Sequence, residues 1–168
     1  MANINRGDRV QNVELTEITS EPTPLIPLSK TKHRPENPAL DIRGYLMYGS
    51  DGRIMGRVEE ILLDADRRTE DRGSPLYHME YAVVRYITRA GAQQWILVPM
   101  AVIKEIHSEK RQVIVREPAR LACQEAFVFR APDELTPENE QEIYTFWDVE
   151  PRWARSGRGP RRLVEERR

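Results

Sequence analysis

Short apolar stretches separated by polar turns run through residues 41–115, and this pattern predicts a sheet of short strands. We expect strands over residues 41–45, 56–64, 78–87, 95–98 and 112–115. Turn-forming residues at 49–52 and 89–92 separate the first strands, because glycine accepts positive φ and aspartate can cap its own turn. Many short strands with turns at even spacing favour a mainly β chain that curls into a small barrel.

The second strand carries most of the expected core. The candidate core side chains are Ile54, just before this strand, and Val58, Ile61 and Leu63 within it. Gly56 interrupts the strand, and a glycine inside a strand predicts a bend or a close backbone approach. After the strand over residues 95–98, we expect a short helical turn over residues 99–103.

Helices are expected only after the sheet. Thr136 is a suitable N-cap, Pro137 suits the first helical position, and the following acids favour the positive end of a helix dipole. Ile143 and Trp147 are four residues apart and, with Phe146, predict one apolar face. We therefore predict a helix over residues 136–147, and a shorter one over residues 117–123.

These elements divide the chain into four parts. Residues 1–40 form a proline-rich extended arm, residues 41–117 the barrel, residues 118–150 a helical extension and residues 151–168 an arginine-rich tail. The arm contains the apolar patch Pro24, Leu25, Ile26 and Pro27. Two interpretations are open: the patch straps its own domain, or it binds in a groove of a partner.

Charge is distributed unevenly along the 168 residues, of which 39% are hydrophobic and 32% charged. Residues 41–150 hold twenty acids and fourteen bases, whereas residues 151–168 hold two acids and seven arginines. A basic tail on an acidic body favours binding to an anionic surface. Lipid headgroups, a partner protein and nucleic acid are the alternatives, and the acidic body argues against nucleic acid. The candidate tail residues are Arg152, Trp153, Arg155, Arg158, Arg161 and Arg162.

No pattern in the sequence predicts catalysis or a metal site. The histidines are isolated, and no glycine-rich phosphate loop is present. The longest apolar run is far shorter than the roughly 20 residues of a spanning helix, and the single Cys123 agrees with a reducing compartment. We therefore predict a non-enzymatic protein on the cytoplasmic side. The acids at Asp64 and Asp66 indicate either a solvated loop or a proton entry point, with His33 as a further candidate.

Four ordered segments resemble the PRC-barrel family, which includes the H subunit of the purple-bacterial photosynthetic reaction centre and a ribosome-maturation factor. Residues 41–44, 51–58, 81–84 and 96–100 carry this resemblance. Residues 130–136, followed by acids and Ile143, look like the segment after the barrel in H subunits. The chain departs from those subunits because its sequence has no N-terminal membrane helix.

The resemblance implies a PRC-type barrel that caps the cytoplasmic face of a reaction-centre core, shields the quinone side and guides proton uptake through surface acids. Asp64 falls where such subunits place a proton-path acid, but Arg67 stands where a second acid is expected. The implied partners are the membrane subunits, with antenna chains or a separate membrane-anchored H-like chain as further candidates. Bacteriochlorophyll, bacteriopheophytin, quinone and iron would all lie on other subunits. The alternative is a stand-alone PRC-barrel adaptor linked to ribosomes or RNA.

Overall fold

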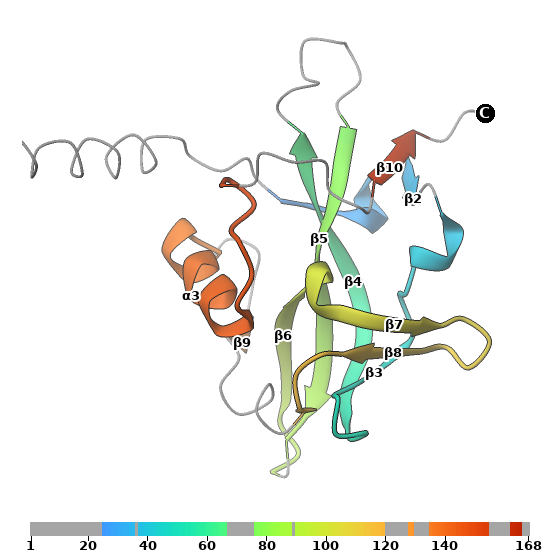
Figure 1. The fold of residues 1–168 in the computed structure, drawn as a ribbon, viewed down its shortest axis with the longest axis vertical. Coiled ribbons are helices and arrows are strands. Elements are labelled where there is room, and N and C mark those ends of the chain that lie inside the picture. The colour runs from blue at the N-terminus through green and yellow to red at the C-terminus, as the bar shows by residue number, and fades with distance from the viewer. Residues whose placement is uncertain are drawn as a thin grey trace, which may run out of the picture.

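The computed structural model describes residues 25–35, 37–66, 76–88, 90–119, 128–129, 135–154 and 162–165. Within these residues the chain is mainly β, with one α-helix and three short 3-10 turns (Figure 1). The strands are β1 (Ile26–Pro27), β2 (His33–Pro35), β3 (Leu46–Tyr48), β4 (Ile54–Asp66), β5 (Leu76–Ile87), β6 (Gln93–Pro99), β7 (Ile103–His107), β8 (Gln112–Val115), β9 (Val128–Phe129) and β10 (Arg162–Glu165). The helix is α3 (Pro137–Trp147), and the 3-10 turns are η1 (Leu28–Lys30), η2 (Pro38–Leu40) and η4 (Met100–Val102).

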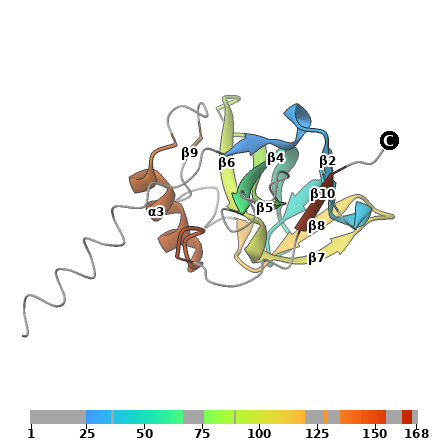
Figure 2. The same ribbon diagram turned by 90° about the horizontal axis from the view of Figure 1, so that it is seen from above.

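The long strands β4 and β5 form the centre of an open, mixed sheet. The strand order is β2-β10-β5-β4-β3-β8-β7, while β1 pairs with β4, β6 pairs with β5, and β9 pairs with β6. All these pairs are antiparallel except β3 with β8. Figure 2 shows α3 beside the sheet, on the side of β6 and β9. The mainly β prediction is therefore confirmed.

Three of the four predicted core residues of β4 are buried, although burial does not alternate strictly, since Leu62 is buried as well. Val58, Ile61 and Leu63 are fully buried. The prediction for Ile54 is wrong, because its side chain is 56% exposed and Met55 is buried in its place. The register between β3 and β4 shifts at this point. The shift adds a residue to β4 and reverses the faces on which its first side chains lie.

Both arms add strands to the sheet. Ile26 and Pro27 in β1 pair with Leu63 and Leu62 of β4, and Leu28 next to them is buried. This arrangement matches the strap interpretation, whereas Pro24 lies outside the described residues. At the other end of the chain, β10 pairs with β2 and with β5.

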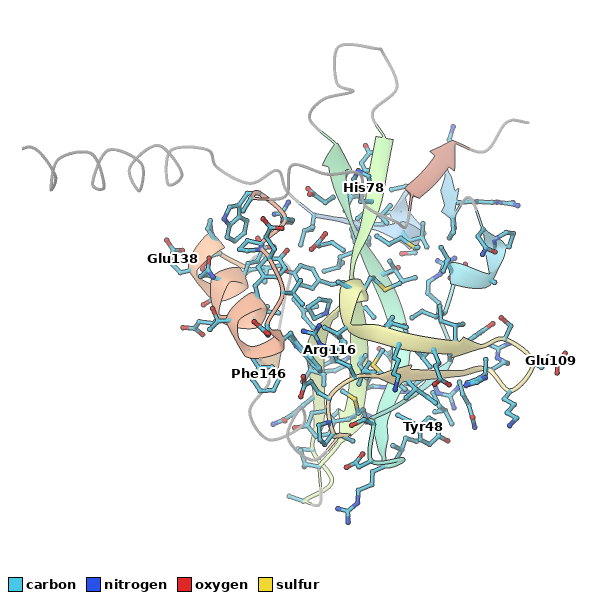
Figure 3. All side chains as sticks on the ribbon, in the orientation of Figure 1. Tyr48, His78, Glu109, Arg116, Glu138 and Phe146 are labelled. Carbon is cyan, nitrogen blue, oxygen red and sulfur yellow. The ribbon has the colours of Figure 1, made fainter. Side chains whose placement is uncertain are left out.

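Helix α3 begins and ends with side-chain contacts. The Thr136 hydroxyl accepts a hydrogen bond from the Asn139 backbone nitrogen at 3.2 Å, so the predicted N-cap is confirmed. At the other end, the Arg116 guanidinium donates to the backbone oxygens of Trp147 and Asp148, which are acceptors left open by the helix (Figure 3). The predicted turn after β6 is confirmed as η4. Most of the predicted helix over residues 117–123 lies outside the described residues.

Candidate functional site

Six polar or aromatic side chains meet where α3 and the turn after it pack on the ends of β4 and β5. Glu80 and Glu140 are 3% and 1% exposed, which is unusual for carboxylates. We call this group the buried polar cluster, and its members are Asp64, Glu80, Tyr81, Glu140, Tyr144 and Arg152.

Arg152 joins three segments of the chain through one guanidinium. Its Nε and one terminal nitrogen donate to the two carboxylate oxygens of Glu140 at 2.8 and 3.0 Å. Its other terminal nitrogen donates to Asp64 Oδ1 at 2.6 Å. The side chains are 4%, 2% and 15% exposed for Arg152, Glu140 and Asp64. A planar guanidinium suits such two-pronged binding of a carboxylate, whereas a lysine ammonium does not.

Two tyrosines supply hydroxyl donors to the buried carboxylates. Tyr81 donates to Glu140 Oε1 at 3.0 Å, and Tyr144 donates to Glu80 Oε1 at 2.8 Å. Their rings stack with centroids 5.7 Å apart, and the ring of Trp153 meets Tyr144 edge-on at 5.6 Å. The cluster thus consists of packed aromatic rings with charged side chains beside them. Each of its carboxylates accepts at least one hydrogen bond, as buried carboxylates require.

A bulge in β5 explains how neighbouring residues both reach α3. Side chains of consecutive strand residues normally point to opposite faces. Leu62 of β4 pairs with Tyr81 and Leu63 pairs with Met79, so Glu80 lies opposite no residue of β4. Such an extra residue bends the strand and re-aims its side chain. Glu140 and Tyr144 come together more simply, since they are four residues apart on one helix face.

Burial and charge set the protonation of the cluster. Burial raises the pKa of both Tyr81 and Tyr144 far above the usual range, and the nearby carboxylates raise each further. Burial lowers the pKa of Arg152, but its hydrogen bonds to Glu140 and the charge of Asp64 outweigh that effect and leave the pKa raised. Both phenols therefore stay protonated as donors, and the guanidinium stays charged at any pH at which the fold survives.

The predicted site residues fall in different places. Asp64 belongs to the buried polar cluster, and its partner in the β5 register is His78. Asp66 is the last residue of β4, and His33 begins β2, which is separated from β5 by β10 in the strand order. The structure brings Asp64 together with Arg152, a contact that the sequence analysis did not foresee.

The prediction of an exposed arginine tail is wrong for Arg152. Its guanidinium is buried against Asp64 and Glu140, so it cannot lie on lipid headgroups or on a partner. Trp153 is partly buried and packs on Tyr144 rather than extending outward. Arg162 begins β10, while Arg155, Arg158 and Arg161 lie outside the described residues.

Sequence reasoning missed Glu80, Tyr81, Glu140 and Tyr144. Two signals were available. A glutamate at position 80 inside an apolar strand is a charge that needs a buried partner. The four-residue spacing of Glu140 and Tyr144, on the face that also carries Ile143 and Trp147, places a carboxylate on the inward side of the helix.

The arrangement holds segments together and could hold or pass protons between its carboxylates. Among the described residues, no group of three or more histidine, cysteine or carboxylate side chains could bind a metal ion. None of the helices in this part of the chain is long and apolar enough to span a membrane. Comparison with known proteins gave no matching family model and no matching curated protein.

Proposed function

We propose that the chain is a non-catalytic docking subunit with a PRC-type barrel, similar to the H subunit of a photosynthetic reaction centre. One observation carries the proposal. The segments at residues 51–58, 81–84 and 96–100 lie in order on β4 with the turn before it, on β5, and on β6 with η4, and all three strands belong to a single sheet. Residues 41–44 lie in the turn that leads into β3 of the same sheet. The sheet with its β8 and β7 hairpin is, in this proposal, the PRC-type barrel.

The segment after the sheet supports the same proposal. Helix α3 follows residues 130–136, which carry the more specific resemblance to H subunits. The helix is fixed to the sheet through Tyr81, Tyr144 and the Arg152 ion pairs. A rigid sheet with a helix held by buried charges offers a preformed surface, which costs less conformational entropy on docking than a mobile one.

In this role the subunit would lie peripherally on the cytoplasmic face of the photosynthetic membrane. It would cap the membrane subunits of the reaction centre and shield their quinone side from water. Bacteriochlorophyll, bacteriopheophytin, quinone and iron would be held by those subunits. Antenna chains, or a separate membrane-anchored H-like chain, are further partners under this proposal.

The partner prediction is tested by a pull-down with tagged full-length chain from solubilised native membranes, followed by an absorption spectrum. We expect bacteriochlorophyll bands in the eluate and reaction-centre subunits on a gel. The tag alone serves as the control. A colourless eluate that contains ribosomal or other soluble proteins would contradict the reaction-centre proposal and favour the PRC-barrel adaptor.

Asp64, with Asp66 and His33, is the proposed entry of a proton path towards the quinone side. Asp64 is the most exposed acid of the Arg152 ion pairs, at 15%. We expect Asp64→Asn to slow flash-induced proton uptake by the purified complex about 100-fold, the lower end of the range for losing a positioned proton-transfer group. Asparagine keeps an oxygen that can accept from Arg152, so the fold is retained.

Glu109→Gln is the matched control, because Glu109 is an exposed acid at the tip of the β7–β8 hairpin, far from α3 (Figure 3). Equal proton-uptake rates for the Asp64 variant, the Glu109 variant and the unchanged complex would exclude Asp64 from the path.

A further inference from the structure

One outward-facing part of the sheet is apolar, although residues 41–150 carry a net charge of −6. Tyr48 pairs with Ile54 on β4 and with Ile114 on β8, so the three side chains share a face. Leu46, two residues before Tyr48, lies on the same face. We call Leu46, Tyr48, Ile54 and Ile114 the outer apolar patch, of which Tyr48 is labelled in Figure 3.

The patch is not part of the hydrophobic core. Ile54 is 56% exposed, and the other three side chains are partly exposed. None of the four belongs to the core cluster or to the partly buried side chains packed against it. Removing an exposed isoleucine from water is favourable, so a surface of this kind favours contact with an apolar medium.

Two exposed arginines border the patch. Arg57 is the register partner of Leu46, and it donates to the Gly44 carbonyl at 3.1 Å. The guanidinium carbon of Arg111 lies 5.3 Å from the centroid of the Tyr45 ring. The same guanidinium lies next to Gly44, since a Cβ placed on Gly44 would be 2.8 Å from Arg111 Nη2. Both guanidiniums therefore lie close to Gly44, in the turn before β3.

No carboxylate among the described residues neutralises either arginine, in contrast to others nearby. Arg85, the register partner of Arg57, binds Glu59 at 2.5 Å. On the opposite border, Glu105 and His107 bind each other at 2.8 Å. With His107 neutral, the two arginine charges still exceed the single charge of Glu105. The net charge of these bordering groups is therefore positive, on a part of the chain that is acidic as a whole.

We propose that the outer apolar patch and the two arginines form a docking surface for an anionic lipid bilayer. Ile54 and Tyr48 would enter the boundary between headgroups and acyl chains, where tyrosine is favoured. Arg57 and Arg111 would bind lipid phosphates. The small size of the patch favours a bilayer over a stable protein partner, whose interface takes roughly 20–30 residues on each side. An isologous dimer through this face would bring the like-charged arginine pairs towards each other.

The test is co-sedimentation of the full-length chain with vesicles, which contain no reaction-centre subunit, so its outcome is independent of the proposed function. Vesicles of phosphatidylcholine and phosphatidylglycerol in equal parts are compared with vesicles of phosphatidylcholine alone. We expect binding to the anionic vesicles that weakens as salt is added.

Three variants locate the surface. We expect Arg57→Gln to lower the partition coefficient about fivefold and the double variant with Arg111→Gln about 25-fold, from the contribution of each base near an anionic surface. We expect Ile54→Ser to lower it about tenfold through lost apolar contact. Lys30→Gln removes another exposed charge, from η1 and away from the patch, and should change binding less than about twofold.

Circular dichroism and the midpoint of thermal unfolding check that each variant is folded. We expect the variants to fold, because Ile54 and Arg57 are exposed. A further variant replaces Arg155, Arg158 and Arg161 with glutamine. Loss of binding in this tail variant, with full binding by Ile54→Ser and by the double arginine variant, would overturn the proposal in favour of the tail. Absence of binding to anionic vesicles, or equal binding to neutral ones, would overturn it as well.

Discussion

Replacing Arg152 with methionine should lower the free energy of unfolding by about 3–5 kcal/mol, the cost of removing one partner from a buried ion pair. The substitution leaves the carboxylate of Glu140, whose side chain is 2% exposed, without the guanidinium that binds both of its oxygens. It also removes the contact with Asp64, and with it the charged tie between α3, the following turn and β4. Urea denaturation, extrapolated linearly to water, measures the loss.

Two further variants separate the buried charge from the lost packing. Combining Arg152→Met with Glu140→Gln removes the unpaired charge, so the double variant should be more stable than Arg152→Met alone. Arg53→Met changes an exposed arginine in the turn before β4 and should alter stability by less than about 0.5 kcal/mol. If Arg152→Met were as mild as Arg53→Met, the ion pairs would not hold the helix to the sheet.

The location of Arg152 shows where sequence reasoning stops. Around it the chain reads as a solvated basic tail, and its partners Glu140 and Asp64 are 12 and 88 residues away. Nothing in the local pattern says that a turn after α3 will place this arginine under the helix. The register of β4 with β5 and the packing of α3 on the sheet decide the position of Arg152. Both depend on contacts between residues far apart in the sequence, so a local pattern does not reveal them.

Elements with local causes were predicted well. Helix α3 follows from the Thr136 cap, the proline after it and the spacing of Ile143 and Trp147. Most of the expected strands follow from apolar stretches between glycine-containing turns. The strand expected over residues 41–45 is wrong, because these residues lead through a turn, in which Gly44 has a φ of 85°, into β3 at Leu46. The prediction for Ile54 failed because a strict alternation of inward and outward side chains assumes a continuous strand. The register shift between β3 and β4 adds one residue to β4, which moves Ile54 to the outer face. The same kind of shift, at Glu80, hid two of the six members of the buried polar cluster, Glu80 and Tyr81.

Gly56 was singled out in the sequence as a point of close backbone approach, and the structure confirms this. A Cβ at this position would come within 2.1 Å of the Arg85 carbonyl oxygen on β5, and the φ of 158° is one that side chains rarely adopt. Gly56→Ala should therefore force β4 away from β5 where the sheet is centred. We expect a loss of about 3 kcal/mol in unfolding free energy, combining a rare backbone conformation with an overpacked contact.

Gly91→Ala is the matched control for Gly56→Ala. Gly91 also has a positive φ, 82°, but a Cβ there would meet nothing within 4 Å. Its substitution should cost only about 1 kcal/mol, the usual penalty for alanine at positive φ. The difference between the two variants in unfolding free energy, measured by urea denaturation, gives the cost of the contact between a Cβ at position 56 and the backbone of β5. Equal losses would mean that β4 and β5 can separate at Gly56 without cost.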